Sequence, residues 1–484
     1  MIMQIGHLLS PSIIPAILLC TVLVHATAQE AEKNYDEAFA LIEVWLDAQR
    51  DYERLPGMSA IVVEDQEVLW KGAFGEANLE ESVSASPSTL YSICSISKLF
   101  TAVAIMKLYD EGKLRLDDTV EDLLPWYNLE QQYAASGPIT VRSLLTHSSG
   151  LPREANYPYW TGPDFPFPSR EEVRDGMRDQ ETLYPASTYF QYSNLGLTLL
   201  GEIVEEVSGQ SYDSFVQEHI LGPLQLGSTR TELPEELYGE ALAIGYSSLT
   251  REGEREKVEL FQARGIKAAA GYSSNVEDLG AFASWQFRLR DTTTTEVLKP
   301  ATLKNMQRVH WMDPDWGTSW GLGFTVAKSP DGQTTFGHGG SCPGYRSALV
   351  LFPKGELAFS VMINASGTSP QKYIWGMQGM LGKVEERKDA EELADLGDYI
   401  GYYNEKPWWG EAYIGSWNGR LVMLALPADQ PAEAMTFFKH VEGDTFRRVR
   451  DDGELGEALI FQRDDAGKII GYTQHTTFSA RLNP

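Results

Sequence analysis

Cysteine is scarce in this sequence, since the 484 residues contain only three. No group of Cys, His or Asp residues has the spacing of a zinc or iron–sulfur site. A glycine-rich phosphate-binding loop is also missing. These absences argue against metal-dependent and nucleotide-dependent functions. We therefore expect no cofactor and no metal.

Positive charge is in short supply. Lys and Arg total 40 residues against 68 Asp and Glu, which gives a formal net charge of −28. Nucleic acids and anionic membrane surfaces repel such a chain. The apolar content of 43% and the charged content of 22% are those of an ordinary soluble protein. We expect neither nucleic acid nor a membrane surface as a partner.

Long apolar runs are lacking except at the start of the chain. Residues 1–28 contain no Asp, Glu, Lys or Arg, and the run from Ile13 to Val24 is almost entirely apolar. Ala26-Thr27-Ala28 has the small-x-small pattern of a cleavage site. This predicts a secretory signal peptide over residues 1–28, although its usual basic residues are absent. The alternative is a retained anchor, for which the apolar run is short. We expect a periplasmic or secreted protein with no membrane insertion after cleavage.

The chain is too long for one average hydrophobic core, so two domains are expected. A charged run begins at Lys383 and predicts a linker over residues 383–395. Beyond it, short apolar stretches alternate with the turn signals Asn418-Gly419 and Asp452-Gly453. The sequence therefore predicts a first domain over residues 29–382 and a small antiparallel, barrel-like β domain over residues 396–484.

The first domain mixes helical and strand patterns. Helical spacing covers Asn34 to Leu55, Thr140 to Pro152, Ser193 to Ser208 and Pro370 to Leu381. Strand patterns cover a hairpin from Gly57 to Trp70 and the segments Trp320–Ala327, Thr334–His338, Ser347–Phe352 and Leu357–Ile363. The aromatic stretch from Tyr157 to Pro168 reads as a loop. These patterns together predict an α+β domain.

The segment Ser95-Ile96-Ser97-Lys98 carries the strongest chemical signal. An apolar helix follows it, with no Pro or Gly until Gly112. Residues three apart lie on one face of a helix, so the lysine amine can reach the serine hydroxyl. A serine needs such a base because its hydroxyl barely ionises at pH 7. Burial should lower the pKa of Lys98 towards the range of a useful base.

Two further segments carry groups suited to the same chemistry. Tyr192-Ser193-Asn194 precedes a predicted helix and offers a phenol that can carry a proton and an amide that can orient neighbours. His338-Gly339-Gly340-Ser341 follows a predicted strand. Its glycines allow close approach of a substrate backbone, and its histidine is a hydrogen-bond donor or a group that titrates near neutrality.

With these motifs in order, the sequence resembles the serine β-lactamase and penicillin-binding-protein superfamily. Within it, the resemblance is to the class C-like branch that holds esterases, D-aminopeptidases and alkaline D-peptidases. It rests on Ser95-x-x-Lys98, Tyr192-x-Asn194 and His338-x-Gly340 and covers about residues 35–380. The tail from Leu396 is similar to the lipocalin-like domain often appended to these enzymes. The implied catalytic fold is an antiparallel sheet flanked by helices, with an all-helical part.

The resemblance also implies roles for these residues. Ser95 is the acylated nucleophile, and Lys98 is its base, acting with Tyr192, which also handles the leaving-group proton. Asn194 holds the substrate amide and keeps Lys98 in place. The backbone N–H groups of Ser95 and Ser341 form the oxyanion hole. The partner is a small-molecule or short-peptide substrate, and nothing in the sequence specifies an oligomeric state.

His338 stands where many β-lactamases and transpeptidases carry a lysine. A permanent cation is thus replaced by a mostly neutral imidazole. The resemblance therefore implies an acyl-enzyme hydrolase of esters or of amides such as D-amino-acid peptides. The alternatives are a β-lactamase, a D,D-carboxypeptidase of the penicillin-binding type, and a catalytically idle cell-envelope binding protein on the same fold.

Two cysteines, Cys94 and Cys342, remain after the predicted cleavage. An exported pair can form a disulfide or stay as free buried thiols. Some class A β-lactamases bridge a cysteine just before the nucleophile to one just after the third motif, and Cys94 and Cys342 occupy those positions. By that resemblance a bridge would tie the nucleophile's helix to the oxyanion strand.

Three other features invite different interpretations. Gly317-Thr318-Ser319-Trp320-Gly321 fits the G-x-S-x-G elbow of α/β-hydrolases, but a polar stretch precedes it and a Gly-rich strand follows. For His147 we favour a structural role at a helix end over a catalytic one. Trp408, Trp409 and Trp417 favour packing in the core of the small β domain over an apolar ligand site.

Overall fold

The computed structural model describes residues 35–384 and 395–482. The predicted signal peptide (residues 1–28) and most of the predicted linker (residues 383–395) lie outside the described residues, so both stay predictions. The helix α11 ends at Leu381, and the 3-10 turn η6 (Gly397–Tyr399) starts the next element. The boundaries of the two predicted domains fall between them.

Within the described ranges the helices are α1 (Asp36–Tyr52), α2 (Ser97–Asp110), α3 (Val120–Leu123), α4 (Val141–Leu145), α5 (Arg170–Gly176), α6 (Asn194–Ser208), α7 (Tyr212–Val216), α8 (Lys267–Ala270), α9 (Val276–Asp291), α10 (Pro300–Met306), α11 (Pro370–Leu381) and α12 (Pro431–Ala434). No helix in these ranges is both long enough and apolar enough to span a bilayer.

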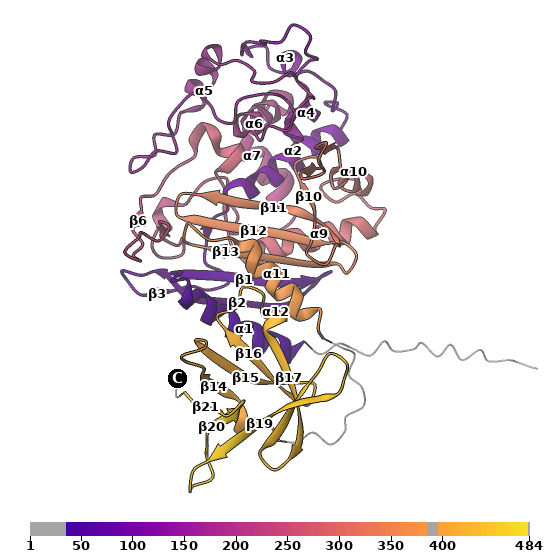
Figure 1. The fold of residues 1–484 in the computed structure, drawn as a ribbon. Helices are drawn as coiled ribbons and strands as arrows, with labels where there is room; N and C mark the ends of the chain where they lie inside the picture. Colours follow the sequence, from indigo (N-terminus) through magenta and orange to yellow (C-terminus); the bar gives the residue numbers. More distant parts are fainter. Residues whose placement is uncertain (1–34, 385–394, 483–484) are drawn as a thin grey trace, which may run out of the picture.

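A nine-stranded antiparallel sheet forms the centre of the first domain (Figure 1). Its strands, in spatial order, are β3 (Val83–Ser84), β2 (Glu67–Asn78), β1 (Gly57–Glu64), β13 (Leu357–Ile363), β12 (Tyr345–Phe352), β11 (Thr334–Cys342), β10 (Thr325–Lys328), β9 (Ser319–Trp320) and β8 (Trp311–Met312). Short pairs join β4 (Tyr91–Ser92) to β7 (Ser273–Ser274) and β5 (Gly245–Tyr246) to β6 (Lys257–Val258). The predicted α+β class is confirmed.

Both faces of this sheet are covered, which explains the continuous apolar runs in its central strands. Successive side chains of a strand point to opposite faces. In β12, Ala348 and Val350 pack in one cluster with residues of α1 and α11. Leu349 and Leu351 pack in the other cluster, with residues of α2 and α9. The nucleophile segment belongs to this second side.

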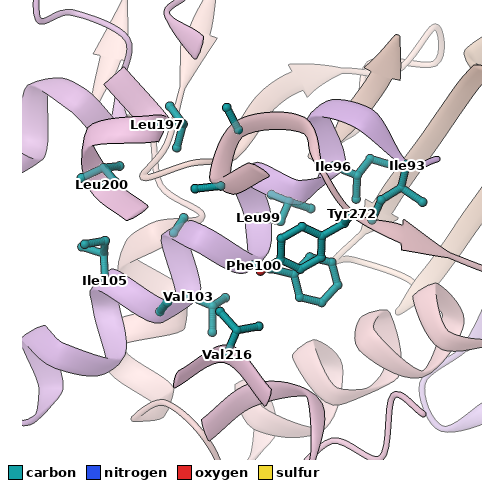
Figure 2. Close-up of a cluster of buried hydrophobic side chains, with 14 of the residues drawn as sticks. Ile93, Ile96, Leu99, Phe100, Val103, Ile105, Leu197, Leu200, Val216 and Tyr272 are labelled. Atoms are coloured by element: carbon teal, nitrogen blue, oxygen red, sulfur yellow. The ribbon is translucent and has the colours of Figure 1, made fainter. Parts of the chain in front are cut away.

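The helix α2 is buried on almost every side, because α6, α7 and α8 surround it. Figure 2 shows Phe100 beside Tyr272, with Leu99 and Val103 turned towards other apolar side chains. The ring of Phe100 stacks on Phe282 at 4.6 Å and on Tyr272 at 5.2 Å. An apolar environment of this kind fixes the helix that carries Lys98 at its first turn.

The helix α4 is shorter than predicted, so the expectation of a helix up to Pro152 was wrong. It ends at Leu145. The Thr146 hydroxyl donates to the Arg142 carbonyl at 2.9 Å, and His147 has a φ of 56°. The left-handed conformation ends the helix, so the segment up to Pro152 runs as a loop.

The second domain is an eight-stranded, nearly closed antiparallel barrel, as predicted. Its strands pair in chain order: β14 (Gly401–Asn404), β15 (Glu411–Trp417), β16 (Arg420–Leu426), β17 (Met435–Glu442), β18 (Thr445–Val449), β19 (Leu455–Arg463), β20 (Ile469–Gln474) and β21 (Thr477–Ala480). A bridge from Tyr403 to Arg481 brings the two ends together. Buried aromatic side chains such as Phe461 and Tyr472 fill the interior.

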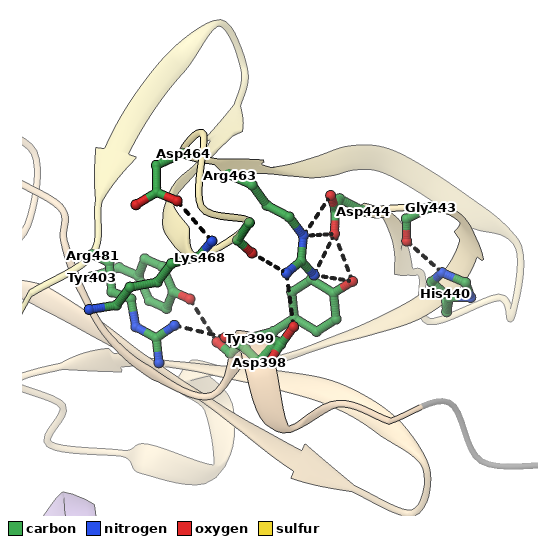
Figure 3. Close-up of polar contacts among 11 residues, drawn as sticks. Asp398, Tyr399, Tyr403, His440, Gly443, Asp444, Arg463, Asp464, Lys468 and Arg481 are labelled. Carbon is green, nitrogen blue, oxygen red and sulfur yellow. Dashed lines mark hydrogen bonds and ion pairs between the residues drawn. The ribbon is translucent and has the colours of Figure 1, made fainter.

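One end of the barrel is held by an ion-pair network. Arg463 lies between Asp398 and Asp444, at 2.8 Å and 2.9 Å (Figure 3). The Tyr399 hydroxyl also donates to Asp444 at 2.8 Å. These contacts tie η6 to β19 and the β17–β18 turn. The segment that enters the barrel is therefore fixed to its wall.

The barrel packs on α1 and α11, away from α2 and α6 (Figure 1). The Trp45 indole donates to the Ala428 carbonyl at 2.8 Å, and the Ala428 N–H donates to Gln49 at 3.0 Å. Trp417 is buried in this interface, as expected of a packing residue. Trp408 and Trp409 are 73% and 69% exposed, so their predicted place in the core was wrong.

Candidate active site

Ser95 and Lys98 lie at the start of α2. Ser95 is in the 3-10 turn η1 (Cys94–Ile96), and Lys98 follows in the first turn of α2. Ser95 is partly exposed, whereas the residues on either side of it are buried. The Lys98 amine lies 3.1 Å from the Ser95 hydroxyl. The i, i+3 spacing therefore places the predicted base and the predicted nucleophile in hydrogen-bond contact.

Lys98 is fully buried and makes two further hydrogen bonds. It donates to Oδ1 of Asn194 at 2.8 Å and to the Ala269 carbonyl at 2.7 Å. A neutral amine has two N–H donors and one lone pair, and these two acceptors take both donors. The lone pair is then directed at the Ser95 hydroxyl, which is the arrangement a general base requires.

The electrostatics of the site lower the pKa of Lys98 and so favour its neutral form. Burial lowers the pKa of Lys98 to about 7, since desolvation disfavours its charged form. The negative charge of Glu154 acts in the opposite direction, and the positive charge of Arg153 adds to the effect of burial. A large fraction of Lys98 is therefore unprotonated at neutral pH.

Tyr192 and Asn194 come from the entry to α6, whose first residue is Asn194 and whose N-cap is Ser193. The Lys98 amine lies 5.0 Å from the centre of the Tyr192 ring. Burial raises the pKa of Tyr192, and a hydrogen bond with Ser95 partly offsets this rise. The phenol therefore lies at the nucleophile in its protonated form. The structure brings Ser95, Lys98, Tyr192 and Asn194 into one site.

His147 holds the segment that carries Tyr192. Its ring stacks on the Tyr192 ring at 4.2 Å, and its Nδ1 accepts the Ser193 N–H at 3.1 Å. Its carbonyl accepts the Gln191 N–H at 2.7 Å. Burial, with the nearby Lys98 charge, lowers the pKa of His147 well below its ordinary value. These contacts agree with the structural role expected for His147.

His338 lies on β11, with its ring 6.2 Å from that of Tyr192 and 5.5 Å from that of Trp320. Burial lowers the pKa of His338 to about 3, which favours a hydrogen-bond donor, one of the two roles considered for it, over a group that titrates near neutrality. Its Nδ1 lies 2.6 Å from the Gly339 carbonyl, which can only accept, so Nδ1 carries the proton. Nε2 has no partner among the described residues.

The rest of the third motif packs against the nucleophile turn. A Cβ atom on Gly340 would overlap with the Ile93 carbonyl and the Ser347 hydroxyl. Only glycine allows β11 to approach the nucleophile turn this closely. Gly339 faces Gln371 of α11, and the Ser341 side chain is exposed. The strand thereby brings the Ser341 backbone alongside η1.

Cys94 and Cys342 form a disulfide across a sequence separation of 248. The bond joins η1 to the end of β11. Cys94 has a φ of 49°, a left-handed conformation that is unfavourable for a residue with a side chain. The disulfide thus holds a strained backbone position directly before Ser95.

Replacing both cysteines with alanine is expected to destabilise the protein by about 5 kcal/mol, the value that the chain-entropy model gives for a loop of this length. The loss follows from the freedom that the unfolded chain regains. Thermal unfolding followed by tryptophan fluorescence would measure it, with oxidised and reduced wild-type protein as controls. A midpoint that stays unchanged in both the variant and the reduced wild type would contradict this expectation.

Two residues of the site were not predicted from the sequence. Glu154 accepts from Nδ2 of Asn194 through both of its carboxylate oxygens, and Arg153 lies 5.0 Å from the centre of the Tyr192 ring. Both lie in the loop after α4 and come to the site only through tertiary packing. No spacing pattern links residue 154 to residue 194, so no signal in the sequence could have identified them.

The alternative serine motif is not an active site. Ser319 begins the short strand β9, and its hydroxyl donates to the Val326 carbonyl at 2.6 Å. A nucleophile elbow needs a helix directly after its serine, and here a strand follows. In the described ranges, no three His, Cys, Asp or Glu side chains are placed to hold a metal ion.

Comparisons with known proteins agree on one family. The profile of the beta-lactamase family matches residues 42–376. Protein flp of Staphylococcus aureus (strain MW2) is 29% identical over 358 residues, which span 72% of this chain and 67% of that protein. Penicillin-binding protein 4 of Amycolatopsis lactamdurans is 28% identical over 356 residues, with 72% of this chain and 91% of that protein covered.

Solved structures extend the likeness beyond the first domain. The octameric penicillin-binding protein homologue from Pyrococcus abyssi aligns with a TM-score of 0.63 and 26% identity over 91% of this chain and 99% of that one. SurE aligns with a TM-score of 0.58 and 24% identity over 92% and 99%. A D-stereospecific amidohydrolase from Streptomyces sp. gives 0.58 and 24% over 69% and 96%. At 24% identity the last two show a common fold alone.

Proposed function

This chain belongs to the beta-lactamase family of hydrolases, and from that premise we propose that it is a serine hydrolase that forms an acyl-enzyme on Ser95. One observation carries the proposal. The Lys98 amine lies 3.1 Å from the Ser95 hydroxyl while its two other contacts, Asn194 and Ala269, occupy its N–H donors. A neutral amine in this arrangement has only its lone pair free, and that lone pair can accept the serine proton.

In the proposed acylation, the Ser95 oxygen attacks the substrate carbonyl carbon and its proton passes to Lys98. The carbonyl oxygen becomes an oxyanion, which the N–H groups of Ser95 and Ser341 stabilise. Collapse of this intermediate expels the leaving group, which takes a proton from Tyr192. Lys98 then returns its proton to Tyr192, so the site ends with no net change in protons.

In the proposed deacylation, a water molecule attacks the ester carbonyl of the acyl-enzyme. Its proton passes to the Tyr192–Lys98 pair and then to the departing Ser95 oxygen. Burial raises the pKa of Tyr192, so its phenolate is a strong base that recovers a proton readily from Lys98. The protonated Lys98 beside it stabilises the phenolate that forms in between.

The substrate class is proposed from the third motif. His338 is buried and neutral, so it offers no charge to pair with a carboxylate. This favours esters and amides such as D-amino-acid peptides over β-lactams, whose carboxylate is usually bound by a lysine. A β-lactamase or a D,D-carboxypeptidase is the second candidate, favoured by the family match and by the similarity to penicillin-binding protein 4.

Export is also part of the proposal. The apolar segment in residues 1–28 supports a periplasmic or secreted enzyme, as does the disulfide between Cys94 and Cys342. The disulfide is relevant because such bonds persist in oxidising compartments.

Steady-state kinetics on three substrate types test the proposed class. We expect short p-nitrophenyl esters or D-amino-acid amides to give a higher kcat/KM than nitrocefin. The reason is that the neutral side chain of His338 offers no positive charge to bind the carboxylate of nitrocefin. If nitrocefin gives the highest kcat/KM of the three substrate types, the protein is better described by the β-lactamase candidate. Absence of turnover and of covalent labelling by a fluorophosphonate would point to an idle binding protein.

A further inference from the structure

Glu154 is a carboxylate next to the catalytic groups that the proposed chemistry does not use. The loop that carries it is fixed to the start of α6. The carbonyl of Arg153 accepts the Asn194 N–H at 2.7 Å and the Leu195 N–H at 3.2 Å. The side chain of Gln180 also donates to the Glu154 carbonyl at 2.9 Å. The backbone at Glu154 therefore keeps a set position relative to Asn194.

The carboxylate itself makes a dense set of contacts. Nδ2 of Asn194 donates to Oε1 at 2.8 Å and to Oε2 at 2.9 Å. The buried Tyr159 hydroxyl donates to Oε2, and Nε of Arg153 lies 3.2 Å from Oε1. Two other side chains, Tyr159 and Arg153, thus hold the carboxylate against the amide of Asn194.

These contacts fix which way the Asn194 amide faces. An ionised carboxylate can only accept hydrogen bonds, so it must face the NH₂ group of the amide. The carbonyl oxygen Oδ1 is then turned to the opposite side, where it accepts from Lys98 at 2.8 Å. A flipped amide would present its NH₂ group to Lys98 and its oxygen to the carboxylate, which is unfavourable at both ends.

We propose that Glu154 is a positioning residue for catalysis: it locks the Asn194 amide so that Oδ1 holds Lys98 with its lone pair on Ser95. This inference rests on the proposed function. Glu154 acts through Asn194 and Lys98 and does not touch the reacting atoms. Its contacts form a chain of four side chains, from Glu154 through Asn194 and Lys98 to Ser95.

A purely structural role would be to anchor Tyr159 and its loop. The two roles differ in how they affect the titration of Lys98. The groups that face the Lys98 amine are Ser95, Asn194, Tyr192, Glu154, Arg153, His147 and His338. Glu154 is the negative charge among them, and it raises the pKa of Lys98 against the effect of burial. Removing this charge should therefore lower the pKa of Lys98, whereas loss of a loop anchor should not.

The test compares Glu154→Gln with wild type in the full-length protein. The pH profile of kcat/KM is measured for a short p-nitrophenyl ester, together with the rate of labelling by a fluorophosphonate. We expect the amide to lose its fixed orientation and kcat/KM to fall about 10- to 100-fold, the size of effect that small misplacements produce. The acidic limb of the profile should shift to lower pH, because the neutral form of Lys98 then appears at lower pH.

Three further variants complete the design. Glu181→Gln removes a charge from an exposed glutamate nearby and should leave both the rate and the profile unchanged. Glu154→Asp keeps the charge and should restore the wild-type position of the acidic limb. Tyr159→Phe removes the loop anchor but leaves the carboxylate, so it should also keep the limb in place. If Glu154→Gln does not fold, Glu154→Asp carries the test, because its shorter side chain keeps the charge but withdraws from the Asn194 amide: kcat/KM should fall while the acidic limb stays in place, and a wild-type rate would overturn the inference.

Two results would overturn the inference while leaving the proposed function intact. One is a Glu154→Gln variant with wild-type rate and profile. The other is a slower variant whose acidic limb has not moved, matched by a similar loss in Tyr159→Phe. A wild-type protein that no fluorophosphonate labels at Ser95 would overturn the proposed function and this inference together.

Discussion

Alanine in place of Ser95 is expected to abolish covalent labelling and to lower kcat/KM by on the order of 10⁴-fold or more, as removal of the nucleophile does in established serine hydrolases. The hydroxyl of Ser95 is the partly exposed group at the start of α2 that lies in hydrogen-bond contact with a base. Without it no acyl-enzyme can form, and only binding and the oxyanion hole remain. Intact-mass measurement after treatment with a fluorophosphonate, and kinetics on a p-nitrophenyl ester, would show both effects.

The matched control for this variant is Ser319→Ala. Ser319 is the serine of the alternative Gly317 to Gly321 motif, and its hydroxyl is hydrogen-bonded within the β8–β10 region. We expect Ser319→Ala to keep wild-type labelling and wild-type kcat/KM. Retained labelling in Ser95→Ala, or its loss in Ser319→Ala, would show that the nucleophile has been placed wrongly.

Methionine in place of Lys98 is the second substitution with a large expected effect. Met matches the length of the lysine side chain but has no amine, so Ser95 loses its base. General-base catalysis contributes on the order of 10²- to 10⁴-fold, and kcat/KM should fall by that amount. Lys98→Arg should be equally impaired, because a guanidinium does not release its proton at these pH values.

The unfolding temperature of Lys98→Met shows whether the variant has lost only its chemistry or also its fold. Burial of an amine with a pKa lowered to about 7 disfavours the folded state at neutral pH, since the unfolded chain keeps it charged. Between pH 7 and pH 10 the unfolded state binds more protons, so this group makes stability rise with pH there. Lys98→Met removes that penalty and should unfold at the same temperature as wild type or higher. A lower unfolding temperature together with lost activity would point to a structural role for Lys98.

Much of the site followed from local spacing. Ser95 and Lys98 are one helical turn apart, so their contact is set by helix geometry once α2 forms. Tyr192 and Asn194 were assigned to the site by the family resemblance, and their place at the start of α6, which Ser193 caps, agrees with it. The strands were predictable for a similar reason, because short apolar runs bounded by turn residues, such as Leu357 to Ile363, favour buried strands.

The parts that sequence reasoning missed depend on contacts between distant segments. Glu154 meets Asn194 across 40 positions, through a loop without periodicity. The sequence left open whether His338 is a hydrogen-bond donor or titrates near neutrality, and burial by neighbours from other elements keeps it neutral. Trp408 and Trp409 have the hydrophobicity of core residues, yet they lie on the exposed connection between β14 and β15. Hydrophobicity does not reveal which side of a turn faces solvent.

The central claim is that neutral Lys98 removes the proton of Ser95. The rate of Ser95 labelling by a fluorophosphonate, measured from pH 5 to pH 9, tests it most directly because labelling reports the attack step alone. We expect a rate that rises with pH and reaches half its maximum near pH 7, where burial places the pKa of Lys98. A rate that is flat across this range, or one that falls as pH rises, would contradict it.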